Sequence, residues 1–292
     1  MIPDSLRDHL ESHLDTSING CAAVSGGSIA NGCRLETSDA SYFLKFGDGT
    51  VAETFPTEVA GLDALRDACE SLVVPDVVEM QTGDDEVPGF LLMEWINAGR
   101  QGRRFWEHFG RGLAQMHRTT NERYGFETSN YIGRLPQTND WNDDWPAFFR
   151  TQRLEPQVER AQASGRWQKE WDEHLDQVYL RLPEMLPARP PASMLHGDLW
   201  KGNFIITATG DPALIDPATY YGHREADLAM TELFGGYDEM FYRAYRDAWP
   251  LKDGYEIRRD IYNLYHLINH LNHFGKSYAG SVTKTFRRIS RL

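Results

Sequence analysis

The chain has 292 residues, a hydrophobic content of 41% and a formal net charge of -13. It is longer than the size at which a single hydrophobic core keeps growing, so we expect two lobes. The negative charge opposes binding to nucleic acid and to anionic membranes, unless a local basic patch overrides it. The sequence also contains no run of about 18 apolar residues that could span a bilayer. From the charge and from this absence, we expect neither nucleic acid nor a membrane as a partner.

Two further features bear on the compartment. The cysteines Cys21, Cys33 and Cys69 are odd in number and lack C-x-x-C spacing, which favours reduced thiols over a disulfide framework or a zinc site. The first ten residues, MIPDSLRDHL, carry charges where a signal peptide needs an apolar stretch, and they predict a short amphipathic helix. We therefore expect a cytoplasmic protein.

A glycine-rich segment at 25–32, SGGSIANG, separates two strand patterns near the start of the chain. Glycine allows backbone N–H groups to approach phosphates closely. Gly26, Gly27 and Ser28 are therefore candidates for covering a nucleotide, although a plain hairpin turn is the more common meaning of such a pattern.

An apolar strand pattern at 42–46 carries a single lysine, Lys45, and a helix pattern follows from Thr57. Glu58 lies in the first turn of that helix. Phosphoryl-transfer enzymes of the protein-kinase type pair a strand lysine with a helix glutamate to position the α- and β-phosphates. We predict this role for Lys45 and Glu58; a solvated lysine at a sheet edge is the alternative.

Two more strands are predicted at 73–78 and 90–95, separated by an acidic loop. The end of the second strand would form the linker between lobes, where backbone groups bind an adenine edge. The linker candidates for cofactor binding are Met93, Glu94, Trp95 and Ile96. We place the domain boundary so that 1–97 form the nucleotide-covering lobe and 98–292 the catalytic and substrate lobe, which is mostly helical in period.

The second lobe contains one helix start with a clear signal. In the stretch 141–149, Asp144 is a candidate N-cap and Pro146 stands near the first helical position. The Trp and Phe residues of this stretch are predicted to pack in the core rather than to bind a ligand.

The stretch 194–217, MLHGDLWKGNFIITATGDPALIDP, organises the chain. Two short apolar runs flank a T-G-D-P turn, which predicts a β-hairpin with Asp198 and Asn203 before it and Asp216 after it. Their oxygens suit Mg²⁺, and their order and spacing match the protein-kinase pattern H-R-D-x-x-x-x-N followed by D-F-G. We predict Asp198 as the catalytic base and Asn203 with Asp216 as magnesium ligands in phosphoryl transfer from ATP. Ordinary turn formation is the alternative.

Departures from the protein-kinase pattern point to a small substrate. Gly197 and Trp200 replace the Arg and Lys of that pattern, and HGDLWKGN resembles small-molecule kinases related to aminoglycoside phosphotransferases and choline kinases. Together with the stretch 216–229, DPATYYGHREADLA, and the stretch 260–272, DIYNLYHLINHLN, it resembles the fructosamine kinase family, also called ketosamine-3-kinases. The resemblance covers nearly the whole chain.

This resemblance implies an α+β, protein-kinase-like fold with a small β-rich N-lobe and a larger, mainly helical C-lobe. It also implies ATP- and Mg²⁺-dependent phosphorylation of the 3-hydroxyl of ketosamines, either free or on glycated protein lysines, which reverses glycation. The residues expected near the sugar are Trp200, Tyr220, His223, Arg224 and Glu225. Some members of the family carry Cys at the position of Ser28. Because a serine hydroxyl lacks thiol chemistry, we expect oxidants to affect the activity of this protein only weakly, unless Cys33 confers redox sensitivity instead.

Several alternatives remain open at this point. One alternative is a kinase of aminoglycoside or choline type, and another is a catalytically silent nucleotide-binding regulator, although the complete set of catalytic positions argues against the last. The segment 220–230, predicted as the loop into the next helix, can also form a buried ion network, and Asp227 can brace the catalytic loop. His266, His270 and His273 share a helical face that suits a metal, but a packed or substrate-facing helix is favoured. The state of assembly, monomer or homodimer, is also open.

Overall fold

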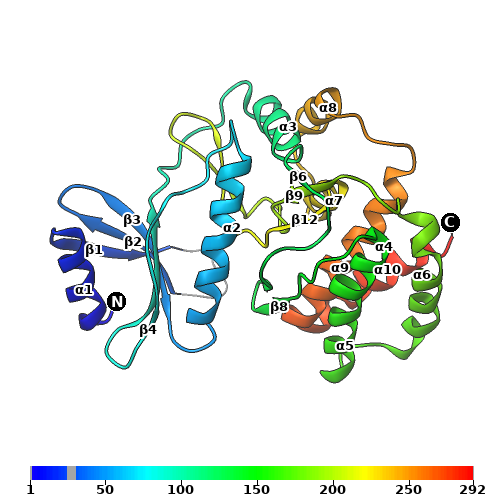
Figure 1. The fold of residues 1–292 in the computed structure, drawn as a ribbon, viewed down its shortest axis with the longest axis horizontal. Coiled ribbons are helices and arrows are strands. Elements are labelled where there is room, and N and C mark those ends of the chain that lie inside the picture. Colours follow the sequence, from blue (N-terminus) through cyan, green and yellow to red (C-terminus); the bar gives the residue numbers. More distant parts are fainter. Residues whose placement is uncertain (1, 25–30, 292) are drawn as a thin grey trace.

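The structure, a computed structural model, describes residues 2–24 and 31–291 and has two lobes. The N-lobe contains a five-stranded antiparallel sheet of order β1-β2-β3-β5-β4 with a helix on each face (Figure 1). Its elements are α1 (Asp4–Leu14), β1 (Ile18–Ala23), β2 (Asn31–Thr37), β3 (Ser41–Gly47), a 3-10 turn (Ala52–Thr54), α2 (Phe55–Ala68), β4 (Val77–Gly83) and β5 (Pro88–Glu94).

The alternation of side chains along β5 explains the layering of this lobe. Phe90 and Leu92 face α1, whose Leu6 and Leu10 are buried against them, as expected for an amphipathic first helix. Leu91 and Met93 point to the other face and pack in the core that contains α2. Because β5 lies between β3 and β4, with α1 on one face and α2 on the other, nearly all of its residues are apolar.

The larger C-lobe is mainly helical, which confirms the predicted division into a β-rich and a helical lobe. Its helices are α3 (Phe105–Met116), α4 (Trp145–Phe148), a π-helical turn (Phe149–Leu154), α5 (Glu155–Ala163), a 3-10 turn (Lys169–Trp171), α6 (Asp172–Met185), α7 (Glu225–Leu233), α8 (Glu239–Ala248), α9 (Tyr255–Phe274), a 3-10 turn (Gly275–Tyr278) and α10 (Ala279–Ile289). Its short strands are β6 (Thr120–Asn121), β7 (Asn130–Ile132), β8 (Leu135–Gln137), β9 (Ala192–Leu195), β10 (Phe204–Ile206), β11 (Pro212–Leu214) and β12 (Tyr220–His223).

Two local predictions for the C-lobe are confirmed. The Asp144 side chain accepts a hydrogen bond from the Ala147 N–H (2.8 Å) and caps α4, and the aromatic residues Trp145, Phe148 and Phe149 are buried in the core. The stretch after the catalytic loop forms the predicted hairpin of β10 and β11. In the described part of the chain, no helix is long and apolar enough to cross a membrane.

The strand predicted at 73–78 is wrong in position. The strand β4 begins at Val77, and Val73 instead exchanges backbone hydrogen bonds with the hairpin of the other lobe. The Val73 N–H donates to Pro212 O (3.0 Å), and Val73 O accepts from the Leu214 N–H (2.8 Å). Val74 is buried in the core shared by both lobes. These apolar residues therefore join the lobes rather than extend the sheet.

The expectation of three reduced thiols is also wrong. Cys21 on β1 and Cys33 on β2 form a disulfide, with Cα atoms 5.9 Å apart. The register of the two strands explains the pairing: Cys21 lies opposite Leu35 and Ala23 opposite Cys33, so the cysteines occupy diagonal positions of adjacent strands. Cys69 is the free cysteine and is half-buried.

Candidate active site

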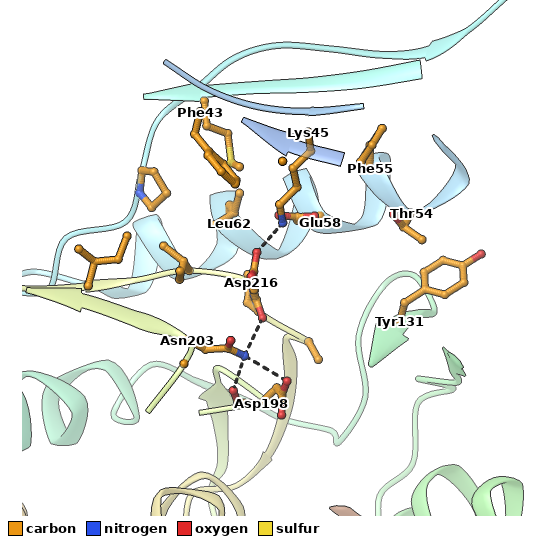
Figure 2. Close-up of a pocket in the computed structure, with 18 of the residues that line it drawn as sticks. Phe43, Lys45, Thr54, Phe55, Glu58, Leu62, Tyr131, Asp198, Asn203 and Asp216 are labelled. Atoms are coloured by element: carbon orange, nitrogen blue, oxygen red, sulfur yellow. Dashed lines mark hydrogen bonds and ion pairs between the residues drawn. The ribbon is translucent and has the colours of Figure 1, made fainter. Parts of the chain in front are cut away.

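A cavity of about 410 Å³ lies between the lobes and contains the predicted catalytic positions (Figure 2). The N-lobe contributes side chains from β3, β5 and α2, and the C-lobe contributes the catalytic loop and the residues that follow β11. Apolar side chains form much of its wall: Phe43, Leu62, Met93, Ile205 and Ile215.

Lys45, Glu58 and Asp216 form one ionic cluster within this cavity. The Lys45 ammonium donates to Glu58 Oε1 (2.6 Å) and also to Asp216 Oδ1 (Figure 2). This one ammonium group on β3 therefore links α2 to the C-lobe. Burial alone would lower the pKa of Lys45, but the carboxylates of Asp216 and Glu58 raise it above its ordinary value. Lys45 therefore stays cationic.

Asp198 lies on the C-lobe side of the cavity, and Asn203 fixes its position. The Asn203 side-chain N–H₂ group donates to Asp198 Oδ2 (3.1 Å) and to its backbone oxygen (2.8 Å). Burial raises the pKa of the Asp198 carboxyl to about 7, against the hydrogen bond from Asn203, and the negative charge of Asp216 adds to the rise. A carboxylate with a pKa near neutrality is suited to accept a proton.

Asp227 fixes the catalytic loop by hydrogen bonds, as expected from the sequence. Its carboxylate accepts hydrogen bonds from the N–H groups of His196 (2.8 Å) and Gly197 (2.9 Å), and a third from the His117 ring (3.2 Å). Gly197 has a φ of 83°, and a Cβ atom there would collide with the carbonyl oxygen of Ala218. This close approach explains why glycine occupies the position that holds arginine in protein kinases.

The predicted cofactor residues fall into two groups. The linker residues line the cavity at the end of β5: Met93, Glu94, Trp95 and Ile96. Gly26, Gly27 and Ser28 lie outside the described residues.

Of the residues predicted to lie near the sugar, one lines the cavity and four do not. Trp200 lines the cavity and is 37% exposed. Tyr220, His223, Arg224 and Glu225 do not line it, because β12 pairs with β9 and directs this segment into the C-lobe interior.

Each of the last three residues has partners of its own in the interior. His223 shares a hydrogen bond with the Tyr262 hydroxyl (2.7 Å), and Arg224 donates to Pro250 O (2.6 Å). Glu225 accepts two hydrogen bonds from Arg258 (2.6 and 3.0 Å). The alternative of a buried ion network describes this segment, and the prediction that it forms the mouth of the site does not match the structure.

Sequence reasoning missed two residues of the cavity wall. Asn130 and Tyr131, on β7, line the cavity, and Figure 2 shows the ring of Tyr131 on the side opposite Phe43, with its hydroxyl turned away from Asp198 and Asp216. Asn130 is fixed by a hydrogen bond from its side chain to Thr219 O (2.8 Å). The sequence around them carried only the turn signal of Gly133 and Pro136, which marks a loop but not its place beside Asp198.

The histidines on one face of α9, at 266, 270 and 273, pack against the protein interior, which agrees with the packed helix expected from the sequence. Burial lowers the pKa of His266 to about 3. His270 donates to His266 O (2.8 Å), and the His273 ring accepts from the Arg134 N–H (2.9 Å) while donating to Asn269 O (3.0 Å). No group of three His, Cys, Asp or Glu side chains within 2–24 and 31–291 is arranged to hold a metal ion.

Relatives of the chain carry names that agree with this geometry. The sequence model of the fructosamine kinase family matches residues 3–291. A probable ketoamine kinase from Synechocystis sp. is 37% identical over 272 residues, which cover 92% of this chain and 90% of the relative. The chloroplastic protein-ribulosamine 3-kinase of Arabidopsis thaliana is 37% identical over 277 residues, covering 91% and 81% respectively.

Solved structures support the same assignment. A crystal structure of a candidate fructosamine-3-kinase from Thermobifida fusca matches with a TM-score of 0.86 at 30% identity, covering 99% of this chain and 100% of that one. A thermostable mutant of aminoglycoside phosphotransferase APH(4)-Ia, in complex with ADP and hygromycin B, matches with a TM-score of 0.65 over 98% of both chains. At 13% identity the latter shows the kinase-like fold alone. From the family match, the relatives and the fold together, we conclude that this chain belongs to the fructosamine kinase family.

Proposed function

We propose that the protein transfers the γ-phosphoryl group of ATP to the 3-hydroxyl of ketosamines. The observation that carries the proposal is the position of Asp198: a carboxyl with a pKa near 7 lies in the same cavity as the Lys45–Glu58 pair, in a chain of this family. The names of the relatives, ketoamine kinase and ribulosamine 3-kinase, identify the acceptor class.

The nucleotide would occupy the N-lobe side of the cavity. Lys45, oriented by Glu58, would bind phosphate oxygens, and the backbone of the linker at 93–96 would bind the adenine edge between apolar walls. Gly26, Gly27 and Ser28 remain the proposed cover of the phosphates. This division leaves the C-lobe side, with Asp198, for the acceptor.

Asn203 and Asp216 fit a magnesium ion. Asn203 uses its amide nitrogen on Asp198, and Asp216 uses Oδ1 on Lys45. Among the described residues, no donor reaches the side-chain oxygen of Asn203 or Oδ2 of Asp216, so two hard oxygen ligands are available. Mg²⁺ prefers a small number of such oxygens together with water and phosphate, and when bound it would neutralise charge on the phosphates.

The acceptor hydroxyl would donate a hydrogen bond to Asp198 and lose its proton to that carboxylate as its oxygen bonds to phosphorus. The bond from phosphorus to the ADP oxygen breaks, so the products are ADP, a ketosamine 3-phosphate and protonated Asp198. The Asn203 hydrogen bond holds the carboxylate toward the cavity throughout. In the family, the 3-phosphate makes the adduct unstable and the amine is released, which would make this reaction a deglycation.

The acceptor side of the cavity suits a sugar joined to an amine. Trp200 would offer an aromatic face to the secondary ammonium, and the ring of Tyr131 would form part of the wall beside the sugar. The net charge of -13 adds a weak long-range attraction for cationic amines. The reaction requires a compartment that supplies ATP, and the cytoplasm, the location expected from the sequence, is one that does.

An ATP-consumption screen across ribulosamines, fructosamines, aminoglycosides and choline tests the proposal. We expect turnover of a ribulosamine or fructosamine of lysine, with phosphorus NMR placing the phosphate on O3 and free amine appearing without added hydrolase. Phosphate on an aminoglycoside or on choline, with no turnover of any ketosamine, would transfer the assignment to another small-molecule kinase.

A further inference from the structure

A series of aromatic side chains connects the cavity with the outer surface of the C-lobe. Its members, which we call the aromatic ridge, are Trp200, Phe234, His270, Phe274 and Tyr278. Ring centroids are 6.3 Å apart between Trp200 and Phe234, 4.8 Å between Phe234 and His270, and 5.5 Å between His270 and Phe274. Tyr278 packs against both His270 and Phe274, at 5.0 and 5.9 Å.

The exposure of the ridge distinguishes it from core packing. Six large hydrophobic side chains are exposed in the described part of the chain, and the two aromatic ones are Trp200, at 37%, and Phe274, at 56%. These two mark the inner and outer ends of the ridge. Single exposed apolar residues are ordinary, but two exposed rings joined by a continuous line of contacts form an apolar surface that starts inside the cavity.

The ridge lies on the acceptor side. Trp200 is two residues from Asp198 on the catalytic loop, whereas Lys45 belongs to the opposite lobe. The outer end lies at the C-terminus of α9, which is tied to the β7–β8 hairpin by the hydrogen bond from the Arg134 N–H to His273 (2.9 Å; Figure 1). That hairpin also carries Tyr131 into the cavity. A molecule that reaches Asp198 with one end can therefore extend along the ridge with the other.

We propose that the ridge binds apolar residues next to a glycated lysine in a polypeptide, and so selects peptide-bound ketosamines with apolar neighbours. The inference rests on the proposed function. With the sugar hydroxyl at Asp198, the four-carbon stem of lysine leads outward past Trp200 and places the peptide backbone partway along the ridge, from where side chains of the neighbouring residues extend toward its outer end. Neighbouring apolar side chains then meet Phe274 and Tyr278.

The electrostatic character of the ridge agrees with this occupant. Burial lowers the pKa of His270, so its ring is neutral at pH 7 and does not repel the secondary ammonium of a ketosamine. Aromatic faces tolerate such a cation well. If a flanking leucine removes about 50 Å² of apolar surface from water at Phe274, we expect about a tenfold gain in affinity.

The test uses two glycated hexapeptides with a central fructosyl- or ribulosyl-lysine, flanked by Leu in one and by Ser in the other. Wild-type enzyme should show a kcat/KM about tenfold higher for the Leu-flanked peptide. In Phe274→Ser this ratio should fall to about one. Leu180→Ser removes a side chain that is 73% exposed on α6 and outside the ridge, and it should keep the ratio at about ten. Thermal unfolding of each variant checks that the comparison is made on folded protein.

A small ketosamine without a peptide, assayed on wild-type enzyme, separates this inference from the proposed function. If it is phosphorylated but the two peptides are used equally, or if Phe274→Ser keeps the preference, the ridge has no role in selecting acceptors. A loss of the preference in Leu180→Ser as well would assign it to general surface apolarity. If no ketosamine is turned over at all, the proposed function fails first.

Discussion

Replacing Asp198 by Asn should inactivate the enzyme and, at the same time, stabilise the protein in the absence of nucleotide and metal. Burial raises the pKa of Asp198 from 3.8 to about 7, which corresponds to about 4 kcal/mol against the charged carboxylate at pH 8. Because the carboxyl borders the cavity and water reaches it from one side, we expect roughly half of this, about 2 kcal/mol. For a chain of this size that is a rise in Tm of roughly 3 °C.

The pH dependence of this gain identifies its cause. Native protein keeps the Asp198 proton up to about pH 7, whereas the unfolded chain releases it near pH 3.8. The native state thus binds more protons in this window, and the contribution of Asp198 to stability decreases as pH rises from 4 to 7. Asn carries no such penalty and can still accept the hydrogen bond from Asn203. The difference between variant and wild type should be near zero at pH 4 and complete above pH 7.

The measurement is thermal unfolding in chelator at pH 4, 6 and 8, with Asp39→Asn as a control at an exposed position of the β2–β3 turn. Turnover of Asp198→Asn should fall by about 10²- to 10⁴-fold, while ATP binding survives. A variant that is no more stable than wild type at pH 8, or one whose gain is the same at pH 4, would refute the reasoning on burial. Near wild-type turnover would refute the assignment of the base.

Four further outcomes follow from the site. Asp216→Ala should lose Mg²⁺-dependent ATP affinity, and activity removed by chelator should return with Mg²⁺ but not Zn²⁺; affinity that still depends on Mg²⁺ would exclude Asp216 as a ligand. Tyr131→Ala removes a ring from the cavity wall and should raise the acceptor KM about 2- to 10-fold while leaving the ATP KM unchanged, and an unaltered acceptor KM would remove Tyr131 from the site. Glu225→Gln should lower the free energy of unfolding in urea by about 3 to 5 kcal/mol because Arg258 loses its buried partner; a raised acceptor KM with full stability would return Glu225 to the substrate site. Burial raises the pKa of Cys69 to about 12, so iodoacetamide should label no cysteine quickly in native protein, one after denaturation without reductant and three with it; rapid native labelling would contradict this.

The catalytic loop was predictable because its groups are close in the sequence. Asp198, Asn203 and Asp216 lie around one hairpin, and the turn signal that closes the hairpin is local. The contact between Lys45 and Asp216 spans 171 positions, and no spacing rule measures such a distance. The sequence paired Lys45 with Glu58 alone, through the match to the protein-kinase order of motifs, and the contact with Asp216 was not predicted.

Register and lobe docking account for the errors. A count of three cysteines cannot reveal that Cys21 and Cys33 take diagonal positions on neighbouring strands, because pairing depends on which residues of β1 and β2 lie opposite each other. Val73 and Val74 have the apolar character of a strand, yet the backbone partners of Val73 belong to the other lobe and Val74 is buried in the core that both lobes share. In both cases the deciding contact is tertiary, and local pattern carries no information about it.

The segment that identified the family most specifically contributes support rather than substrate contacts. In YYGHREADLA, Tyr220 and Glu225 are buried, and the carboxylate of Asp227 holds the N–H groups of His196 and Gly197. A side chain that must fit one buried position and satisfy several partners there is more restricted than one that faces a cavity. A stretch of this kind is therefore easy to recognise in a sequence, and its side chains are easily assigned to substrate binding although they are buried in the protein. The acceptor wall, with Tyr131 on a short loop strand, has the opposite character, and only the three-dimensional arrangement brings it to Asp198.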